Sequence, residues 1–246
     1  MASFSVIIAA AGQSSRFQDQ NYKKPFIPLA GKAVWLHSAE KFLKRDDVKQ
    51  VIVVISPEDR EMFQIKFGAN IAILGIDVVD GGSERCESVQ NALNVVRDEM
   101  EYVAVHDAAR PCFADEWIDR VFDEATKSGA AIPATPVVGT VKKSASGKTI
   151  DQTVDRTHLW IAQTPQVFRK DILLSAYAKR ANQVFTDEAQ AVEASGHPVS
   201  IVTGSSLNLK ITTKEDLKLA EQVLKVLPKP NLSGPAHPFA DDDLWR

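Results

Sequence analysis

The sequence has little cysteine and no long apolar run. Its two cysteines, Cys86 and Cys112, make neither a disulfide scaffold nor a zinc site, so we expect a reducing, cytoplasmic setting. No apolar stretch approaches the ~18 residues that suggest a membrane helix, so we expect no membrane association. Residues 1–12 are apolar but have no basic start, which predicts a strand and not a signal peptide.

An excess of charge of either sign is also missing. Lys and Arg number 29 and Asp and Glu number 32, which leaves a net charge of −3. Such a balance argues against non-specific nucleic-acid binding, which needs excess basic charge, so we expect no nucleic-acid partner. At ~150 residues per domain, 246 residues allow one large domain or one domain with an appendage. We predict a single domain over residues 1–227.

What the first half contains is an alternation of short β-branched apolar runs with helix-like segments. The predicted strands are 5–10, 51–55, 77–80, 102–105 and 130–136, and the predicted helices include 34–43, 85–96 and 115–128. Ser56 and Pro57 predict the N-cap and first turn of another helix. This alternation favours an α/β fold: a three-layer, Rossmann-like, mostly parallel sheet flanked by helices. Because ligands bind at the carboxyl ends of such strands, the loops after Ala10, Asp80 and Val105 should converge.

The second half departs from this pattern. Residues 139–157 are polar and contain a Ser-x-Gly turn, which predicts a projecting β-arm. The arm is either a solvated hairpin without a further role or a dimerisation arm. Helices are predicted at 171–180 and 187–194, a strand at 199–203, an extended segment at 208–212, and a helix from Thr213 to Leu227. Residues 228–246 hold four prolines and predict a flexible tail.

The loop after the first strand reads AAAGQSSRF over residues 9–17. Small residues let the backbone approach a ligand, and free N–H groups there can hold phosphates. Arg16 adds a fixed positive charge suited to phosphate oxygens, and Lys24 follows eight residues later. The loop is a candidate phosphate site, although a plain small-residue turn and a surface lysine pair remain open.

Two further loops carry candidate residues. The double glycine of residues 80–88 could expose backbone for base recognition, with a Ser88 hydroxyl added, or form an ordinary β-to-α turn. The segment HDAARP, residues 106–111, places Asp107 at a strand end, where a carboxylate suits a hard cation or a sugar hydroxyl. Arg110 pairs with Asp107 or with an anion. Taken alone, Thr186 is as readily a helix N-cap as a site residue, and Lys210 is as readily a charge at the edge of the sheet as a site residue.

Seven motifs then occur in order along residues 5–227. They are AAG-x-x-x-R, a lysine eight residues on, DGG-x-x-R-x-x-S, HDAARP, TVDR-x-x-LW-x-AQTPQ, TDEA and N-x-K-x-T. Together they resemble the 2-C-methyl-D-erythritol 4-phosphate cytidylyltransferase family. The resemblance implies transfer of a cytidylyl group from CTP to the sugar phosphate with release of pyrophosphate, in non-mevalonate isoprenoid synthesis. It also implies a divalent cation, usually Mg²⁺, and a homodimer whose arms reach the neighbouring site.

Residue roles follow from the resemblance. It assigns nucleotide binding to Ala10, Ala11, Gly12, Gly82 and Ser88. It assigns catalysis to Arg16 and Lys24 on the triphosphate and to Arg156 and Lys210 on the sugar phosphate. It assigns substrate binding to Asp107, Arg110, Thr140, Thr164 and Thr186, with Asp107 near the metal and with Thr140 and Arg156 acting in the same or the partner subunit. The chain departs from the family pattern at Ser14, Pro25, Ser83 and Gly139.

The implied chemistry needs no general base. A phosphate monoester has a second pKa of ~6, so the nucleophile is largely a dianion at neutral pH. What the reaction needs is fixed positive charge around two crowded anions. One rival is a cytidylyltransferase for another polyol phosphate, such as ribitol 5-phosphate; Ala109, Arg156 and Trp160 favour the methylerythritol substrate. A non-catalytic nucleotide-binding module is a rival of another class, disfavoured by the retained charged residues.

Overall fold

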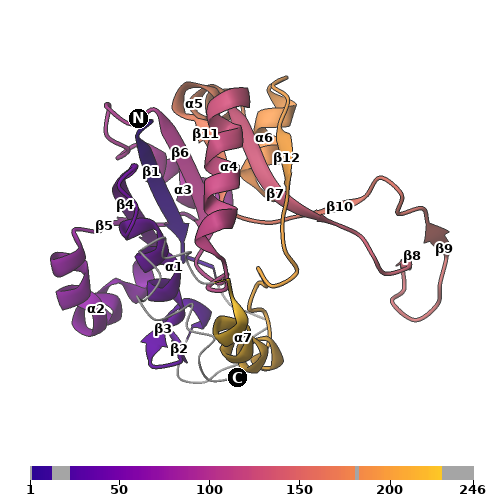
Figure 1. The fold of residues 1–246 in the computed structure, drawn as a ribbon, viewed down its shortest axis with the longest axis horizontal. Helices are drawn as coiled ribbons and strands as arrows, with labels where there is room; N and C mark the ends of the chain where they lie inside the picture. The colour runs from indigo at the N-terminus through magenta and orange to yellow at the C-terminus, as the bar shows by residue number, and fades with distance from the viewer. Residues whose placement is uncertain (1, 13–22, 181–182, 229–246) are drawn as a thin grey trace, which may run out of the picture.

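The computed structural model describes residues 2–12, 23–180 and 183–228. An eight-stranded sheet crosses the molecule with helices on both sides (Figure 1). Its strands are β1 Phe4–Ala9, β4 Val48–Ile55, β5 Asp77–Asp80, β6 Tyr102–Asp107, β7 Ala130–Pro136, β10 Trp160–Ala162, β11 Gln166–Arg169 and β12 Ser200–Thr203. The helices are α1 Val34–Leu43, α2 Arg60–Leu74, α3 Arg85–Leu93, α4 Asp115–Ser128, α5 Lys170–Lys179, α6 Glu188–Ala194 and α7 Lys214–Val226.

The sheet is mostly parallel, with two antiparallel strands. Its order is β10-β7-β11-β6-β1-β4-β5, and β12 pairs with β7 outside this path. Strands β6, β1, β4 and β5 are parallel neighbours, and β12 is parallel to β7. Strand β11 is antiparallel to both β6 and β7, and β10 is antiparallel to β7. The predicted α/β class with a mostly parallel sheet is confirmed.

The side chains of β1 show why the sheet is covered on both faces. Phe4, Val6 and Ile8 belong to one buried cluster, which also contains side chains of α1, α2 and α4. Ile7 points to a second cluster, built with α3, α5 and α6. Successive strand residues face opposite sides, so an uninterrupted apolar run buries both faces. The two clusters join the sheet to a layer of helices on each of its faces, which gives the three layers that the sequence predicts.

The predicted arm is present. Strands β8 (Val141–Lys143) and β9 (Gln152–Val154) pair antiparallel and lie away from the body (Figure 1). Its residues are nearly all exposed, whereas the neighbouring β7 is largely buried. Among the residues described, we find no helix with both the length and the apolar character needed to cross a bilayer.

Small elements lie below the carboxyl edge of the sheet. They are the short helices η1 (Lys24–Phe26) and η2 (Pro57–Asp59) and the strand pair β2 (Pro28–Leu29) and β3 (Lys32–Ala33). Helix α7 packs with this region through a third apolar cluster that contains Leu29, Ile211 and Val223. This packing fixes the segment before α7, where Lys210 lies.

Several local predictions were wrong. Ser56 is the N-cap residue and Pro57 is in the first turn, as predicted, but Ser56 makes no side-chain cap bond, and the short helix η2 precedes α2, which begins only at Arg60. Helix α3 ends at Leu93 and not at residue 96, since the amides of Val95 and Val96 bond to carbonyls three residues back. Strand β11 was not predicted, because Gln166 gives its short run a polar start. Strand β6 continues two residues beyond the predicted end and includes Asp107.

Candidate functional site

The first and second candidate loops touch each other at the carboxyl edge of the sheet. Gly81 is buried, and its amide donates to the carbonyl of Ile55 at 2.7 Å. A Cβ added at Gly81 would lie 2.7 Å from Ala11 Cβ and 2.8 Å from Ser88 Oγ. The loops therefore meet at a spacing that only glycine permits. Ala10, whose amide bonds to the carbonyl of Val54 at 2.8 Å, holds the start of the first loop on β4.

The second loop is held by hydrogen bonds among its own residues. The Ser88 hydroxyl accepts from the Gly82 amide and donates to the Glu84 carbonyl, both at 3.1 Å. Glu84 and Glu87 form a capping box at the start of α3. With its hydrogen given to Glu84, the Ser88 hydroxyl keeps only an acceptor lone pair for a ligand.

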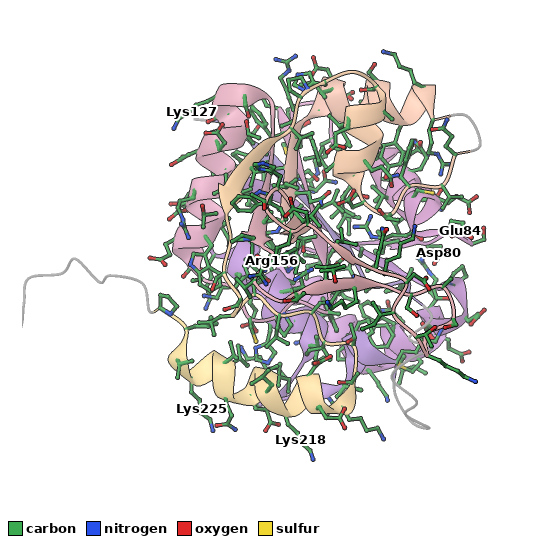
Figure 2. The ribbon with its side chains drawn as sticks, turned by 90° about the vertical axis from the view of Figure 1, so that its right-hand side faces the viewer. Asp80, Glu84, Lys127, Arg156, Lys218 and Lys225 are labelled. Atoms are coloured by element: carbon green, nitrogen blue, oxygen red, sulfur yellow. The ribbon has the colours of Figure 1, made fainter. Side chains whose placement is uncertain are left out.

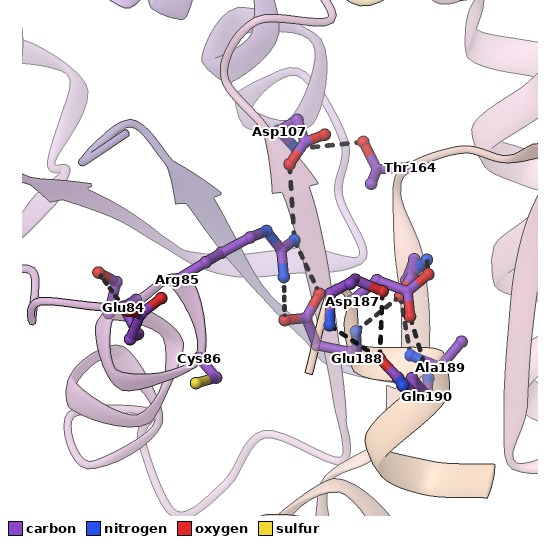
Figure 3. Close-up of polar contacts among 12 residues, drawn as sticks. Glu84, Arg85, Cys86, Asp107, Thr164, Asp187, Glu188, Ala189 and Gln190 are labelled. Atoms are coloured by element: carbon purple, nitrogen blue, oxygen red, sulfur yellow. Dashed lines mark hydrogen bonds and ion pairs between the residues drawn. The ribbon is translucent and has the colours of Figure 1, made fainter. Parts of the chain in front are cut away.

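Asp107, at the end of β6, is the centre of a charged cluster. Lys210 Nζ lies 2.7 Å from its Oδ2, and Arg110 Nε lies 3.6 Å from the same oxygen. Arg85 Nη2 lies 3.5 Å from Oδ1 (Figure 3). Three cations thus surround one carboxylate whose side chain is 11% exposed. Oδ1, which has only the long contact to Arg85 among these three, is the oxygen better placed to accept a further partner.

The charges around Asp107 control its ionisation. Burial alone would raise the pKa of this carboxyl, but Arg85 and Lys210, followed by Arg110, hold the pKa well below its ordinary value. The neighbouring His106 is fully buried between Phe42 and Phe113, and burial lowers its pKa to about 4. At neutral pH the site therefore holds an ionised Asp107 beside a neutral His106.

A chain of hydrogen bonds ties Thr164 to both residues. His106 Nε2 lies 3.0 Å from the Arg110 carbonyl, which only accepts, so a neutral His106 carries its proton on Nε2. His106 Nδ1 then accepts from the Thr164 hydroxyl at 3.1 Å, and that hydroxyl accepts from the Asp107 amide at 3.1 Å. The Thr164 hydroxyl has one lone pair left and no hydrogen to offer a phosphate.

The segment before α7 reaches the same place through backbone bonds. Arg110 Nη1 donates to the Asn208 carbonyl at 2.7 Å, and the Ile211 amide donates to the Ala109 carbonyl at 2.8 Å. Thr213 and Asp216 form a capping box that fixes the start of α7. Lys210 is therefore held beside Asp107 by the chain on both sides of it, and the alternative of a mere sheet-edge charge fails.

Two residues of the cluster were missed from the sequence. Arg85, the first residue of α3, pairs with Glu188 at the start of α6, and Glu188 is buried (Figure 3). Arg85 is the arginine of the DGG-x-x-R-x-x-S motif and Glu188 the glutamate of TDEA. The motifs could have drawn attention to both, but nothing in the sequence indicates that these two motifs meet.

The remaining candidates lie elsewhere or outside the described residues. Thr140 and Arg156 are exposed on the arm. The Arg156 side chain donates a hydrogen bond to the carbonyl of Val138. Figure 2 looks at the molecule from the side toward which the arm projects, and it labels Arg156. Thr186 is exposed and donates to Gln190, so the N-cap of α6 is Asp187 and not Thr186. Gly12 is the last described residue of the first loop, and Lys24 is the first residue of η1. Three predictions lie outside the described residues: those for Ser14, for Arg16 and for the tail from residue 229.

The donor set at Asp107 fits a cation only in part. Within the described residues, no three His, Cys, Asp or Glu side chains gather closely enough to hold a metal ion by themselves. Mg²⁺ is commonly bound through one or two carboxylates together with substrate phosphates and water. A single carboxylate, with Oδ1 the less closely paired oxygen, suits that mode and not a dedicated all-protein metal site.

Comparisons with known proteins agree on one family. The model of the 2-C-methyl-D-erythritol 4-phosphate cytidylyltransferase family matches residues 4–226. A protein of that name from Rhodopirellula baltica is 42% identical over 234 residues, covering 91% of this chain and 95% of the relative. A crystal structure of the protein of that name from Thermus thermophilus is similar, with a TM-score of 0.76 and 31% identity, covering 92% of this chain and 100% of that chain. A crystal structure of the protein of that name from Francisella tularensis is also similar, with a TM-score of 0.75 and 32% identity, covering 91% of this chain and 100% of that chain.

Proposed function

Because this chain belongs to the 2-C-methyl-D-erythritol 4-phosphate cytidylyltransferase family, we propose that it transfers the cytidylyl group of CTP to 2-C-methyl-D-erythritol 4-phosphate. The products are 4-diphosphocytidyl-2-C-methyl-D-erythritol and pyrophosphate, a step of non-mevalonate isoprenoid synthesis. The observation that supports it best is the Asp107 carboxylate ringed by Arg85, Arg110 and Lys210 beside a closely packed glycine loop.

The reaction joins two anions at phosphorus. An oxygen of the sugar phosphate bonds to the α-phosphorus of CTP, and the bond from that phosphorus to the bridging oxygen of the β-phosphate breaks. Pyrophosphate leaves with the electron pair. Because the attacking phosphate is already a dianion, the residues serve to hold, align and neutralise the substrates.

The loops after β1 and β5 are the proposed nucleotide site. Ala10, Ala11 and Gly12 offer backbone to the triphosphate, and Arg16 and Lys24 supply the positive charge that stabilises the transition state. Gly82 and Ser88 read the base. An acceptor-only Ser88 hydroxyl suits the exocyclic amino group of cytosine, which is a donor, and not the O4 of uracil, which is an acceptor.

The groups around Asp107 form the proposed sugar phosphate site. Lys210 and Arg110 attract the phosphate, and Asp107 accepts from a sugar hydroxyl. Thr164 adds only an acceptor, since its hydrogen is committed to His106. Thr186 is a further proposed contact. Mg²⁺ is the proposed cofactor: bound through Asp107 Oδ1 and substrate phosphates, it would offset negative charge on the triphosphate.

We propose that the arm completes the site of a second copy of the chain. Thr140 and Arg156 are exposed on the arm, whose strands β8 and β9 lie away from the sheet (Figure 1). Three apolar side chains at the base of the arm and along β10 are exposed: Val138 at 83%, Trp160 at 44% and Ile161 at 54%. They offer an apolar contact for a homodimer.

We also propose that the protein is located in the cytoplasm.

Product analysis tests the proposed function. The purified chain is incubated with CTP, Mg²⁺ and either methylerythritol phosphate or ribitol 5-phosphate, and released pyrophosphate and the cytidylylated product are measured. Turnover with methylerythritol phosphate at least about tenfold faster, a difference of ~1.4 kcal/mol in transition-state binding, is expected. Faster turnover with ribitol 5-phosphate would assign the rival substrate, and no pyrophosphate with either would leave a nucleotide-binding module.

A further inference from the structure

A buried ion pair lies beneath the proposed active site. Arg85 Nη1 donates to Glu188 Oε1 at 2.5 Å and Arg85 Nη2 donates to Glu188 Oε2 at 2.9 Å, which is a bidentate pairing (Figure 3). The Glu188 side chain is 1% exposed and that of Arg85 is 28% exposed. A buried pair of this kind is weak evidence for stability, because apolar residues of similar size often stabilise a core at least as well.

Glu188 is held by Tyr177 and Gln166 in addition to Arg85. Tyr177 of α5 donates its hydroxyl to Oε1 at 3.2 Å. The backbone amide of Glu188 and that of Ala189 both donate to Gln166 Oε1, at 3.1 and 3.0 Å, and Gln166 Nε2 donates to Asp187 at 2.8 Å. Gln166 belongs to β11, the strand next to β6. The position of Glu188 is therefore set by the sheet that also carries Asp107.

Arg85 divides its guanidinium between two carboxylates. Its two short bonds go to Glu188, and its contact with Asp107 is longer, at 3.5 Å. Without Glu188, the same guanidinium would be free to form a short bidentate pair with Asp107. That pair would occupy Oδ1, the oxygen that the other two cations leave available.

Arg85 also joins the two halves of the site. It is the first residue of α3, directly after the loop proposed to read the base, while Asp107 belongs to the sugar phosphate side. The start of α3 does not depend on the Arg85 side chain, since the capping box is made by Glu84 and Glu87. Changes at Arg85 should therefore affect Asp107 more than the nucleotide loop.

We propose that Arg85 and Glu188 are positioning residues: Glu188 holds Arg85 at a distance from Asp107 at which the Asp107 carboxylate is oriented but still free to bind substrate. The inference rests on the proposed function. It assigns the pair to the alignment of Asp107 and not to the nucleotide loops, so its loss should lower kcat and leave the affinity for CTP without Mg²⁺ unchanged.

Three variants of the full chain test this: Glu188→Gln, the double variant Arg85→Met with Glu188→Leu, and Tyr177→Phe. The first frees Arg85 with little change in shape, and the second replaces the pair by apolar side chains. Both should lose about 10–100-fold in kcat, the effect typical of residues that orient a ligand group. Tyr177→Phe removes one hydrogen bond from the same carboxylate but leaves both bonds between Arg85 and Glu188, so its kcat should stay within about twofold.

Each variant is measured for kcat by pyrophosphate release with Mg²⁺, for the Kd of CTP by calorimetry without Mg²⁺, and for Tm. A low kcat in a double variant with wild-type Tm and a CTP Kd within about twofold supports the positioning role. A folded double variant with wild-type kcat overturns it, even if Glu188→Gln alone fails to fold. Equal losses of CTP affinity and kcat also overturn it. Failure of the wild-type chain to release pyrophosphate would contradict the proposed function and not this inference.

Discussion

Replacing Gly81 by alanine tests whether the two nucleotide loops must meet as closely as they do. The added methyl carbon would lie 2.7 Å from Ala11 Cβ and 3.3 Å from the Ile55 carbonyl oxygen. Carbon atoms attract one another best at ~3.5–4.0 Å, so the Ala11 loop has to move by roughly 1 Å. Ser88 Oγ, 2.8 Å from the new carbon, must move as well.

Overpacking a close-packed site by one methyl group typically costs ~1–3 kcal/mol. If binding CTP requires the original loop spacing, the same free energy opposes binding, and the Kd for CTP rises by roughly 5- to 150-fold. Calorimetric titration of CTP into Gly81→Ala and into the wild-type chain measures this change directly.

Gly139→Ala is the matched control, because a Cβ at Gly139 meets nothing within 4 Å. Its Tm and CTP affinity should match those of the wild type. A Gly81→Ala variant whose CTP affinity and Tm both equal the wild-type values would refute the argument that these loops are packed to the limit that glycine sets.

Three further predictions concern single side chains of the site. Burial lowers the pKa of His106 from 6.5 to about 4, so below pH 6.5 the side chain takes up a proton when the protein unfolds. The contribution of His106 to the free energy of unfolding is therefore complete above pH 6.5 and falls as the pH drops, by about 2 kcal/mol at pH 5. Urea unfolding of metal-free protein at pH 7.5 and 5.0 should show a loss that is about 2 kcal/mol larger in the wild type than in His106→Gln, and equal losses would refute it. Thr164→Val removes the hydroxyl between His106 and the Asp107 amide and should cost about 1–3 kcal/mol in urea unfolding, whereas Thr164→Ser should retain most of the stability. Ser88→Ala should raise turnover with UTP relative to CTP by about tenfold, given that one base-reading hydrogen bond is worth ~1–3 kcal/mol; an unchanged CTP/UTP ratio would remove Ser88 from base recognition.

The sequence predicted where the site lies better than it predicted the hydrogen bonds and ion pairs among the site's side chains. Buried strands followed by small or charged residues indicate which loops share one edge, and the contacts of Gly81 with Ala11 and of Asp107 with Arg85 confirm that the loops after β1, β5 and β6 converge. This works because the carboxyl ends of parallel strands meet at the same edge, whatever the loops contain.

The pairing of Arg85 with Glu188 could not be predicted in the same way. The two residues are 103 positions apart, and they meet because β11 inserts antiparallel between β6 and β7. A four-residue strand with a polar first residue has too short a pattern to be recognised, and α6 is placed through it. The roles of Thr164 and Ser88 were likewise hidden, because a sequence does not show which partner takes a hydroxyl hydrogen.

Turnover by Lys24→Ala beside Lys23→Ala is the measurement that tests most directly whether fixed positive charge carries this reaction. Lys23 is the neighbouring residue of equal charge, and it is paired with Asp59 at 2.9 Å and Glu58 at 3.5 Å. At saturating CTP and methylerythritol phosphate, Lys24→Ala should lower kcat by ~10²–10³, and Lys23→Ala should leave it within about twofold. Near-normal turnover by Lys24→Ala, or equal losses in both variants, would contradict the account.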